Sequence, residues 1–99
     1  MRAVLHQDIV ALACCLLALP SAQRKCAARR IVAFTARADR YRKCKGRAHP
    51  LYGNGTLQSC CQSVPKAQER RLDDPDYGDC LIRALETVLA FRAGLANSG

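Results

Sequence analysis

Histidine and aromatic residues are scarce in this sequence of 99 residues. It has two histidines, no tryptophan, three tyrosines and two phenylalanines. It also lacks a glycine-rich phosphate loop, a Gly-x-Ser-x-Gly motif and the paired histidines of zinc sites. A nucleophilic cysteine would need a histidine base. Only His49 is a candidate, because the other histidine, His6, lies in the segment predicted below as a signal peptide. These absences predict a protein that is not an enzyme and that holds no metal or cofactor.

Acidic residues are also few, with eight against sixteen basic residues and a net charge of +8. The excess lies between residues 24 and 47, where ten basic residues accompany only Asp39. Such a block favours anionic partners, here an anionic membrane surface. The predicted contacts are Arg29, Arg30, Arg37, Arg40 and Lys43. The alternative is a solvated helix face that keeps the protein soluble. The block offers only Phe34 and Tyr41 for base stacking, so we do not expect nucleic acid as a partner.

The apolar run at residues 9–19 has eleven residues, whereas a bilayer span needs about 20. Arg2 precedes this run and Pro20-Ser21-Ala22 follows it, which is the arrangement of a signal peptide and its cleavage region. We therefore predict a signal peptide at residues 1–22 and a secreted, extracellular domain at residues 23–99. Asn54-Gly55-Thr56 is an acceptor triplet for glycosylation at Asn54 in such a protein. The alternative is a hydrophobic first helix of an intracellular protein.

Seven cysteines are many for a chain of this length, and five remain after a signal peptide at residues 1–22. This density is typical of small secreted domains, whose cores need disulfide staples. The neighbours Cys60 and Cys61 point about 100° apart on a helix, so each must reach a different segment. We predict a disulfide hub at this doublet; the alternative is a doublet that arose by chance. Because five is odd, one thiol stays free or pairs between chains.

Helical periodicity organises the rest of the chain. Apolar residues recur at helical spacing between residues 26 and 44 and between residues 81 and 89. A short helix is predicted at residues 57–63, around the cysteine doublet. Asp76 or Asp79 is the expected N-cap of the last helix, and Gly94 its end. The predicted fold is all-α, a small disulfide-stapled bundle of three or four helices.

Residues 53–64 and 79–81 resemble segments of plant non-specific lipid-transfer proteins, which are secreted, small, basic and all-helical. The first segment is like the loop and Cys-Cys doublet of that family, and the second is like the end of its Cys-x-Cys segment. Gly78 replaces the first cysteine of Cys-x-Cys, and the last two cysteines of the family pattern are missing. The resemblance implies an apolar tunnel between helices that holds acyl chains.

Carried over residue by residue, the resemblance also implies two disulfides, Cys26–Cys80 and Cys44–Cys60. The partner of Cys61 would be one of the missing cysteines. Cys61 is therefore the thiol expected to pair with a second chain if the protein forms a disulfide-linked dimer.

The function predicted from these features is binding of a lipid or fatty-acid-like ligand in the helical core. The predicted lipid-binding residues are Ile31, Phe34, Tyr41, Leu81, Leu85, Val88 and Leu89. The alternative is that these side chains fill the core themselves. The predicted function is then that of a secreted cationic effector, an antimicrobial or signalling peptide that acts through its basic helix face.

Overall fold

The fold consists of four helices joined by loops. The computed structural model describes the backbone of residues 1–98 and the side chains of residues 1–94. The helices are α1 (His6–Leu17), α2 (Ser21–Lys45), α3 (Leu57–Cys61) and α4 (Pro75–Ser98). The described residues form no strand, only one isolated bridge between His49 and Gly53. The prediction of an all-α fold with three or four helices is confirmed.

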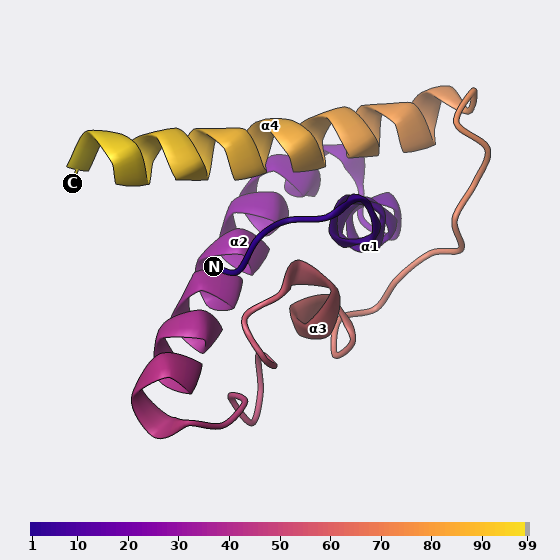
Figure 1. The fold of residues 1–99 in the computed structure, drawn as a ribbon. Coiled ribbons are helices and arrows are strands. Elements are labelled where there is room, and N and C mark those ends of the chain that lie inside the picture. The colour runs from indigo at the N-terminus through magenta and orange to yellow at the C-terminus, as the bar shows by residue number, and fades with distance from the viewer. Residues whose placement is uncertain (99) are drawn as a thin grey trace.

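Helix α1 lies at the centre of the core: like α2 it packs against each of the other three helices, and in addition its second half is buried on every side. Figure 1 shows it between α4 and α3. Every residue from 12 to 17 is buried, and a helix that is apolar all round is stable only when it is surrounded. The apolar run predicted as a signal peptide thus lies inside the folded domain. Cleavage after Ala22 would remove α1 from the fold, and that cleavage stays a prediction.

The start of α1 is fixed by Asp8, whose carboxylate is buried. It accepts hydrogen bonds from the backbone N–H groups of Leu5 at 2.8 Å and Gln58 at 3.0 Å. A carboxylate at a helix N-terminus satisfies free N–H groups and suits the helix dipole. Because Gln58 lies in the first turn of α3, this one side chain also joins α1 to α3.

Helix α2 begins at Ser21, five residues before the predicted start, because no helix breaker follows Pro20. It ends at Lys45, and its C-cap is Gly46, which has a φ of 71° and donates its N–H to the Arg42 carbonyl oxygen at 2.8 Å. This left-handed cap is inexpensive only for glycine. The basic residues in the last turn complement the negative end of the helix dipole.

Helix α4 differs from the prediction at both ends. Its N-cap is Asp74, whose carboxylate accepts a hydrogen bond from the Tyr77 N–H at 2.9 Å, and Pro75 is the first helical residue. Gly94 does not end the helix, which continues to Ser98. A glycine within a helix costs only about 1 kcal/mol relative to alanine, and neighbouring turns readily offset that cost.

Neither aspartate predicted as the cap has that role: Asp79 accepts from Arg83, and Asp76 binds Arg24 of α2. The buried Arg24 guanidinium donates to both Asp76 carboxylate oxygens, at 2.6 and 3.2 Å. Its Nε also donates to the carbonyl oxygens of Leu16 at 3.0 Å and Leu19 at 3.2 Å. The hydrogen bond from Arg24 lowers the pKa of Asp76. One arginine therefore ties the end of α1 to the start of α4.

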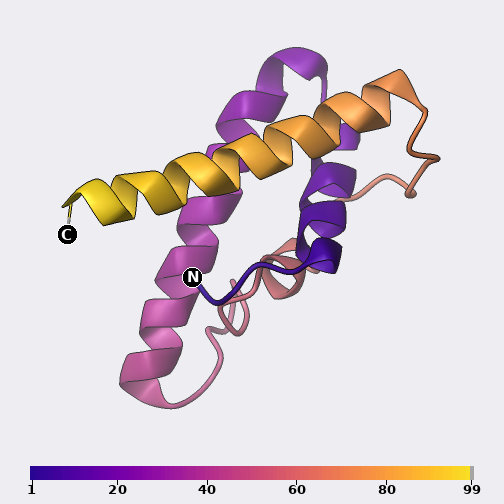
Figure 2. The same ribbon diagram turned by 45° about the horizontal axis from the view of Figure 1, so that its top comes forward.

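The N-terminal arm, residues 1–5, crosses from α2 to the start of α1 (Figures 1 and 2). The Met1 amino group lies 3.1 Å from a carboxylate oxygen of Asp39 on α2. The Arg2 N–H donates to the Gly55 carbonyl oxygen at 3.0 Å. On the other side, Arg92 of α4 donates to the Arg2 carbonyl oxygen at 2.9 Å. The arm is thus held by α2, α4 and the loop before α3.

All seven cysteines are free thiols in the structure. The Cys44–Cys60 bridge cannot form in this fold, since Cys60 Sγ lies 3.9 Å from the Ile31 carbonyl oxygen. Cys44 lies about 20 Å further along α2, at 1.5 Å per residue, and a disulfide needs Cα atoms within about 7 Å. The Cys26–Cys80 bridge is absent too: both are free thiols, Cys26 exposed on α2 and Cys80 buried on α4. Of the four cysteines predicted to form disulfides, Cys60 and Cys80 are buried thiols, and Cys26 and Cys44 are exposed thiols.

We expect seven free thiols in the unfolded protein and only two that react rapidly in the folded protein. The fast pair is Cys26 and Cys44, because these are exposed and the other five are buried. A chromogenic disulfide reagent, applied with and without denaturant to protein purified in air, counts them. The double variant Cys26→Ser, Cys44→Ser is the control and should show no fast phase. Fewer than seven thiols in denaturant, with a melting temperature that falls on reduction, would restore the disulfide prediction.

Candidate functional site

An open apolar groove lies between the start of the chain and α4. Its volume is about 820 Å³. One wall comes from the N-terminal arm and the first turn of α1, and the other comes from α4. The lining residues are Ala3, Val4, Leu5, His6, Ile9, Leu81, Ile82, Leu85, Val88, Leu89 and Arg92.

The groove gathers most of the large apolar side chains that the described residues leave in solvent. Of the six such side chains, Leu5, Ile82, Leu85 and Leu89 line it, with exposures of 48–59%. The two others, Leu51 and Leu72, lie outside it. Isolated exposed leucines are ordinary, whereas a contiguous apolar patch marks a surface that binds something. The groove is therefore the candidate functional site.

The polar residues of the groove are both basic in type. Arg92 donates to the Met1 and Arg2 carbonyl oxygens at 3.4 and 2.9 Å, so its guanidinium fixes the arm and keeps a positive charge at the groove. His6 is exposed in the first turn of α1. No acidic residue is among the lining residues. The groove suits an apolar ligand whose polar end is neutral or negative.

The structure divides the predicted lipid-binding residues between three places. Leu81, Leu85, Val88 and Leu89 lie together in the groove. Ile31 is buried in the core, and the remaining two, Phe34 and Tyr41, belong to an aromatic cluster. The expected single cavity between the two apolar stripes is thus not formed by these seven residues, because the stripe of α2 gives Ile31 to the core and Phe34 and Tyr41 to the aromatic cluster.

The aromatic cluster attaches the loop after α2 to that helix. The rings of Phe34 and Tyr52 stack with centroids 4.5 Å apart, and those of His49 and Tyr52 lie 4.7 Å apart. Tyr41 meets His49 edge-on at 4.8 Å. His49 Nδ1 accepts hydrogen bonds from the N–H groups of Leu51 and Tyr52. These contacts give His49 a role in loop structure.

The basic residues predicted to meet an anionic surface lie along α2. Arg29, Arg30, Arg37 and Arg40 are exposed and form no ion pair with any described residue. Lys43 differs, because its Nζ lies 3.2 Å from Asp39. The Arg37 guanidinium also lies 5.9 Å from the Phe34 ring centroid, within cation–π range. Four of the five cations are thus available to a partner.

Residues 53–56 hold the predicted glycosylation acceptor in a tight turn. The Asn54 side chain is exposed, and its Oδ1 accepts hydrogen bonds from the Thr56 N–H at 3.2 Å and hydroxyl at 2.8 Å. Gly55 has a φ of 95°, and a Cβ there would lie 2.9 Å from Asp39 atoms. Only glycine fits so close to α2 in this backbone conformation. Glycosylation of Asn54 stays a prediction.

The buried thiols of α1 and α3 meet inside the core. Cys15 and Cys61 hydrogen-bond to each other, which lowers the pKa of Cys15 and, with burial, raises the pKa of Cys61. Burial likewise raises the pKa of the neighbouring Cys60. Over the described residues, no three metal-ligating side chains come together. These thiols pack as small apolar side chains, as free cysteines commonly do.

Fold and groove together define a small all-helical domain with an exposed apolar groove. The chain belongs to the family described as domain of unknown function (DUF7742), whose profile matches residues 2–88. The matched region includes α1 and residues 2–5 of the arm. No curated protein and no solved structure matches the chain. Within the described residues, no helix combines the length and apolar character of a membrane span.

Proposed function

We propose that this protein binds the acyl chain of an anionic amphiphile in the apolar groove between the N-terminal arm and α4. The observation that carries the proposal is the gathering of Leu5, Ile82, Leu85 and Leu89 along one open groove. Four of the seven residues predicted to contact lipid line this groove. The sequence prediction and the observed groove therefore have these four residues in common. Ile9 and the arm complete the wall that the sequence pattern lacked.

The groove supplies apolar contact along its length and positive charge at Arg92. A buried methylene contributes about 0.8 kcal/mol, and a groove open on one side recovers part of that amount. Two methylenes therefore change the dissociation constant by at most about tenfold, since 1.4 kcal/mol is a factor of ten. A carboxylate or phosphate head near Arg92 adds an ion pair that an uncharged head cannot form.

The exposed arginines of α2 support a second function, adhesion to anionic membranes. Arg29, Arg30, Arg37 and Arg40 lack ion pairs with the described residues, so no carboxylate must be displaced before a phosphate group binds. Each such cation contributes about 1 kcal/mol near an anionic surface and acts within a Debye length. Adhesion to a membrane would bring the groove close to the lipids that it is proposed to bind. A higher salt concentration should weaken this adhesion.

Displacement of a fluorescent fatty-acid probe tests the groove. We expect oleate to displace the probe from the folded protein, and Ile82→Glu and Leu85→Glu each to weaken binding at least tenfold. A charge placed on the apolar wall repels the head group and leaves apolar contacts unmade. The exposed side chains of Leu51 and Leu72 are outside the groove, so Leu51→Glu and Leu72→Glu are matched controls.

Circular dichroism should show native helicity in all four variants, because each substitution is at a solvent-accessible position. Equal loss of binding in the controls would show that negative charge, and not the groove, weakens binding. Failure of the folded wild-type protein to bind oleate or the probe would overturn the proposed function.

A further inference from the structure

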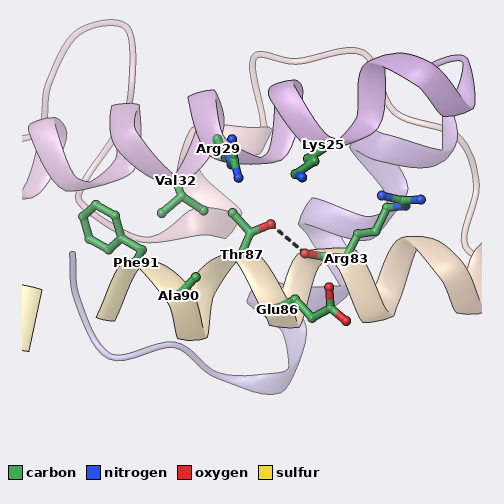
Figure 3. A pocket seen from close by; sticks show the side chains of 8 residues that line it. All are labelled: Lys25, Arg29, Val32, Arg83, Glu86, Thr87, Ala90 and Phe91. Carbon is green, nitrogen blue, oxygen red and sulfur yellow. Dashed lines mark hydrogen bonds between the residues drawn. The ribbon is translucent and has the colours of Figure 1, made fainter. Parts of the chain in front are cut away.

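A second cavity lies between α2 and α4, and it shares no lining residue with the groove. Its volume is about 440 Å³, within the range of about 300–1,000 Å³ that is typical of small-molecule sites. Figure 3 shows the side chains that α2 contributes above it and those that α4 contributes below. The lining residues are Lys25, Arg29, Val32, Arg83, Glu86, Thr87, Ala90 and Phe91. We refer to this cavity as the α2/α4 pocket.

One end of the α2/α4 pocket is apolar. Val32 is buried there, Phe91 is half-buried, and Ala90 adds a small side chain that leaves space. In Figure 3 the Phe91 ring and Val32 stand together at this end. A flat or branched apolar group placed there would cover both side chains. The apolar end therefore fits the body of a compact ligand better than a long acyl chain.

The other end carries two cations without carboxylate partners. Lys25 and Arg29 lie one turn apart on α2, and in Figure 3 both charged ends turn toward α4 near Thr87. Neither forms an ion pair with a described residue. Like charges four residues apart on a helix repel each other. A bound anion would relieve this repulsion.

The acidic groups near the pocket do not neutralise these two cations. Asp79 is engaged by Arg83, whose Nε donates to it at 2.9 Å. Glu86 lines the pocket, but its carboxylate points away from α2 in Figure 3 and is in no ion pair of the described residues. The Thr87 hydroxyl donates to the Arg83 carbonyl oxygen at 2.7 Å. Recognition of an anion therefore rests on the ammonium and guanidinium groups.

We propose that the α2/α4 pocket binds a small aromatic carboxylate, with its carboxylate between Lys25 and Arg29 and its ring against Val32 and Phe91. A guanidinium forms paired hydrogen bonds with a carboxylate, and the ammonium adds a second charged donor. The half-buried Phe91 offers a ring for aromatic contact. This site goes beyond the proposed acyl-chain function and does not depend on it.

Binding of 2-naphthoate, measured by calorimetry and by amide shifts in NMR spectra, tests the proposal. We expect the double variant Lys25→Gln, Arg29→Gln to weaken binding at least tenfold, and Ala90→Trp to abolish it by filling the pocket. The matched control is Arg30→Gln, Arg37→Gln, which removes the same charge from α2 outside the pocket. 2-Naphthalenemethanol, with the same rings and no charge, should bind at least tenfold more weakly than 2-naphthoate.

The shifts on binding should centre on Val32, Thr87 and Phe91. Equal weakening by the control double variant would overturn the proposal, because it would show that 2-naphthoate binding depends only on the net charge of the protein. Unchanged binding in Ala90→Trp would overturn it as well. The groove variant Leu85→Glu should bind 2-naphthoate like the wild-type protein while it loses the fatty-acid probe, so the two sites can fail separately.

Discussion

A chain that begins at Gln23 is expected not to fold. Deletion of residues 1–22 removes a helix that contacts all three others, with the fully buried Leu12 and Leu16 and the buried Leu17. Each leucine contributes about 1.5–3 kcal/mol through burial, whereas an entire domain is stable by only about 5–15 kcal/mol. The deletion also removes the buried Asp8, which joins α1 to α3. The summed loss is comparable with the whole stability of such a domain.

The measurement is thermal unfolding of the full chain and the deleted chain, followed by circular dichroism. The full chain should unfold cooperatively, and the deleted chain should show little helix and no transition. Within the full chain, Leu12→Ala should cost about 2–5 kcal/mol, while Gln7→Ala at an exposed position of α1 should cost less than about 0.5 kcal/mol.

The same experiment decides between the two interpretations of the apolar run at residues 9–19. A deleted chain with native helicity and a sharp transition would contradict our expectation and support a secreted domain at residues 23–99. The mass of the protein purified from its source organism gives an independent answer, since a retained α1 adds residues 1–22.

The two interpretations of this run differ physically in what surrounds it. Eleven apolar residues are long enough for a signal peptide and equally for a buried helix, and composition does not separate the two. In the folded chain the Asp8 carboxylate caps α1 and binds the Gln58 N–H, a role that a cleaved leader would not need. A contact between residues fifty positions apart has no signature in local sequence.

The helical periodicity of the sequence predicts the α4 wall of the groove but not the wall formed by the N-terminal arm and α1. The repeat of Leu81, Leu85, Val88 and Leu89 placed these residues on one face of a helix, and they do share the groove. Leu5 and Ile9 fall in the predicted signal peptide, so the sequence does not predict the wall that they form. The cysteines misled for a related reason, because a buried thiol and half of a disulfide look alike in a sequence.

Asp39→Asn is expected to cause the largest loss of stability among single polar substitutions. The Asp39 carboxylate is 2% exposed and lies 3.1 Å from the Met1 amino group, 3.0 Å from Arg42 and 3.2 Å from Lys43. The amino group is buried as well. Removing one partner from a buried ion pair leaves the other charge without compensation and costs about 3–5 kcal/mol. For a domain of this size, that corresponds to a fall of about 15 °C or more in melting temperature.

The same carboxylate makes stability depend on pH in the acid range. Burial acts to raise the pKa of Asp39, but hydrogen bonds from Arg42, the Met1 amino group and Lys43 outweigh burial and hold the pKa well below its usual value of 3.8. A carboxyl group with a lower pKa in the folded state stabilises the fold fully above its unfolded pKa. That stabilisation is lost as pH falls below about 4 toward the folded pKa.

Urea unfolding at pH 7 and pH 3 of an untagged chain, with Met1 free, measures both effects. The wild-type protein should lose stability between these two pH values, and Asp39→Asn should lose less over the same interval because it has no carboxyl group to protonate there. The exposed Asp73 forms a comparable pair with Arg71 at 3.0 Å. Asp73→Asn is therefore the matched control and should cost less than about 1 kcal/mol. If Asp39→Asn were as mild as Asp73→Asn at pH 7, the ion-pair cluster at Met1 would not hold the N-terminal arm in place, and the arm's wall of the groove would lose its support.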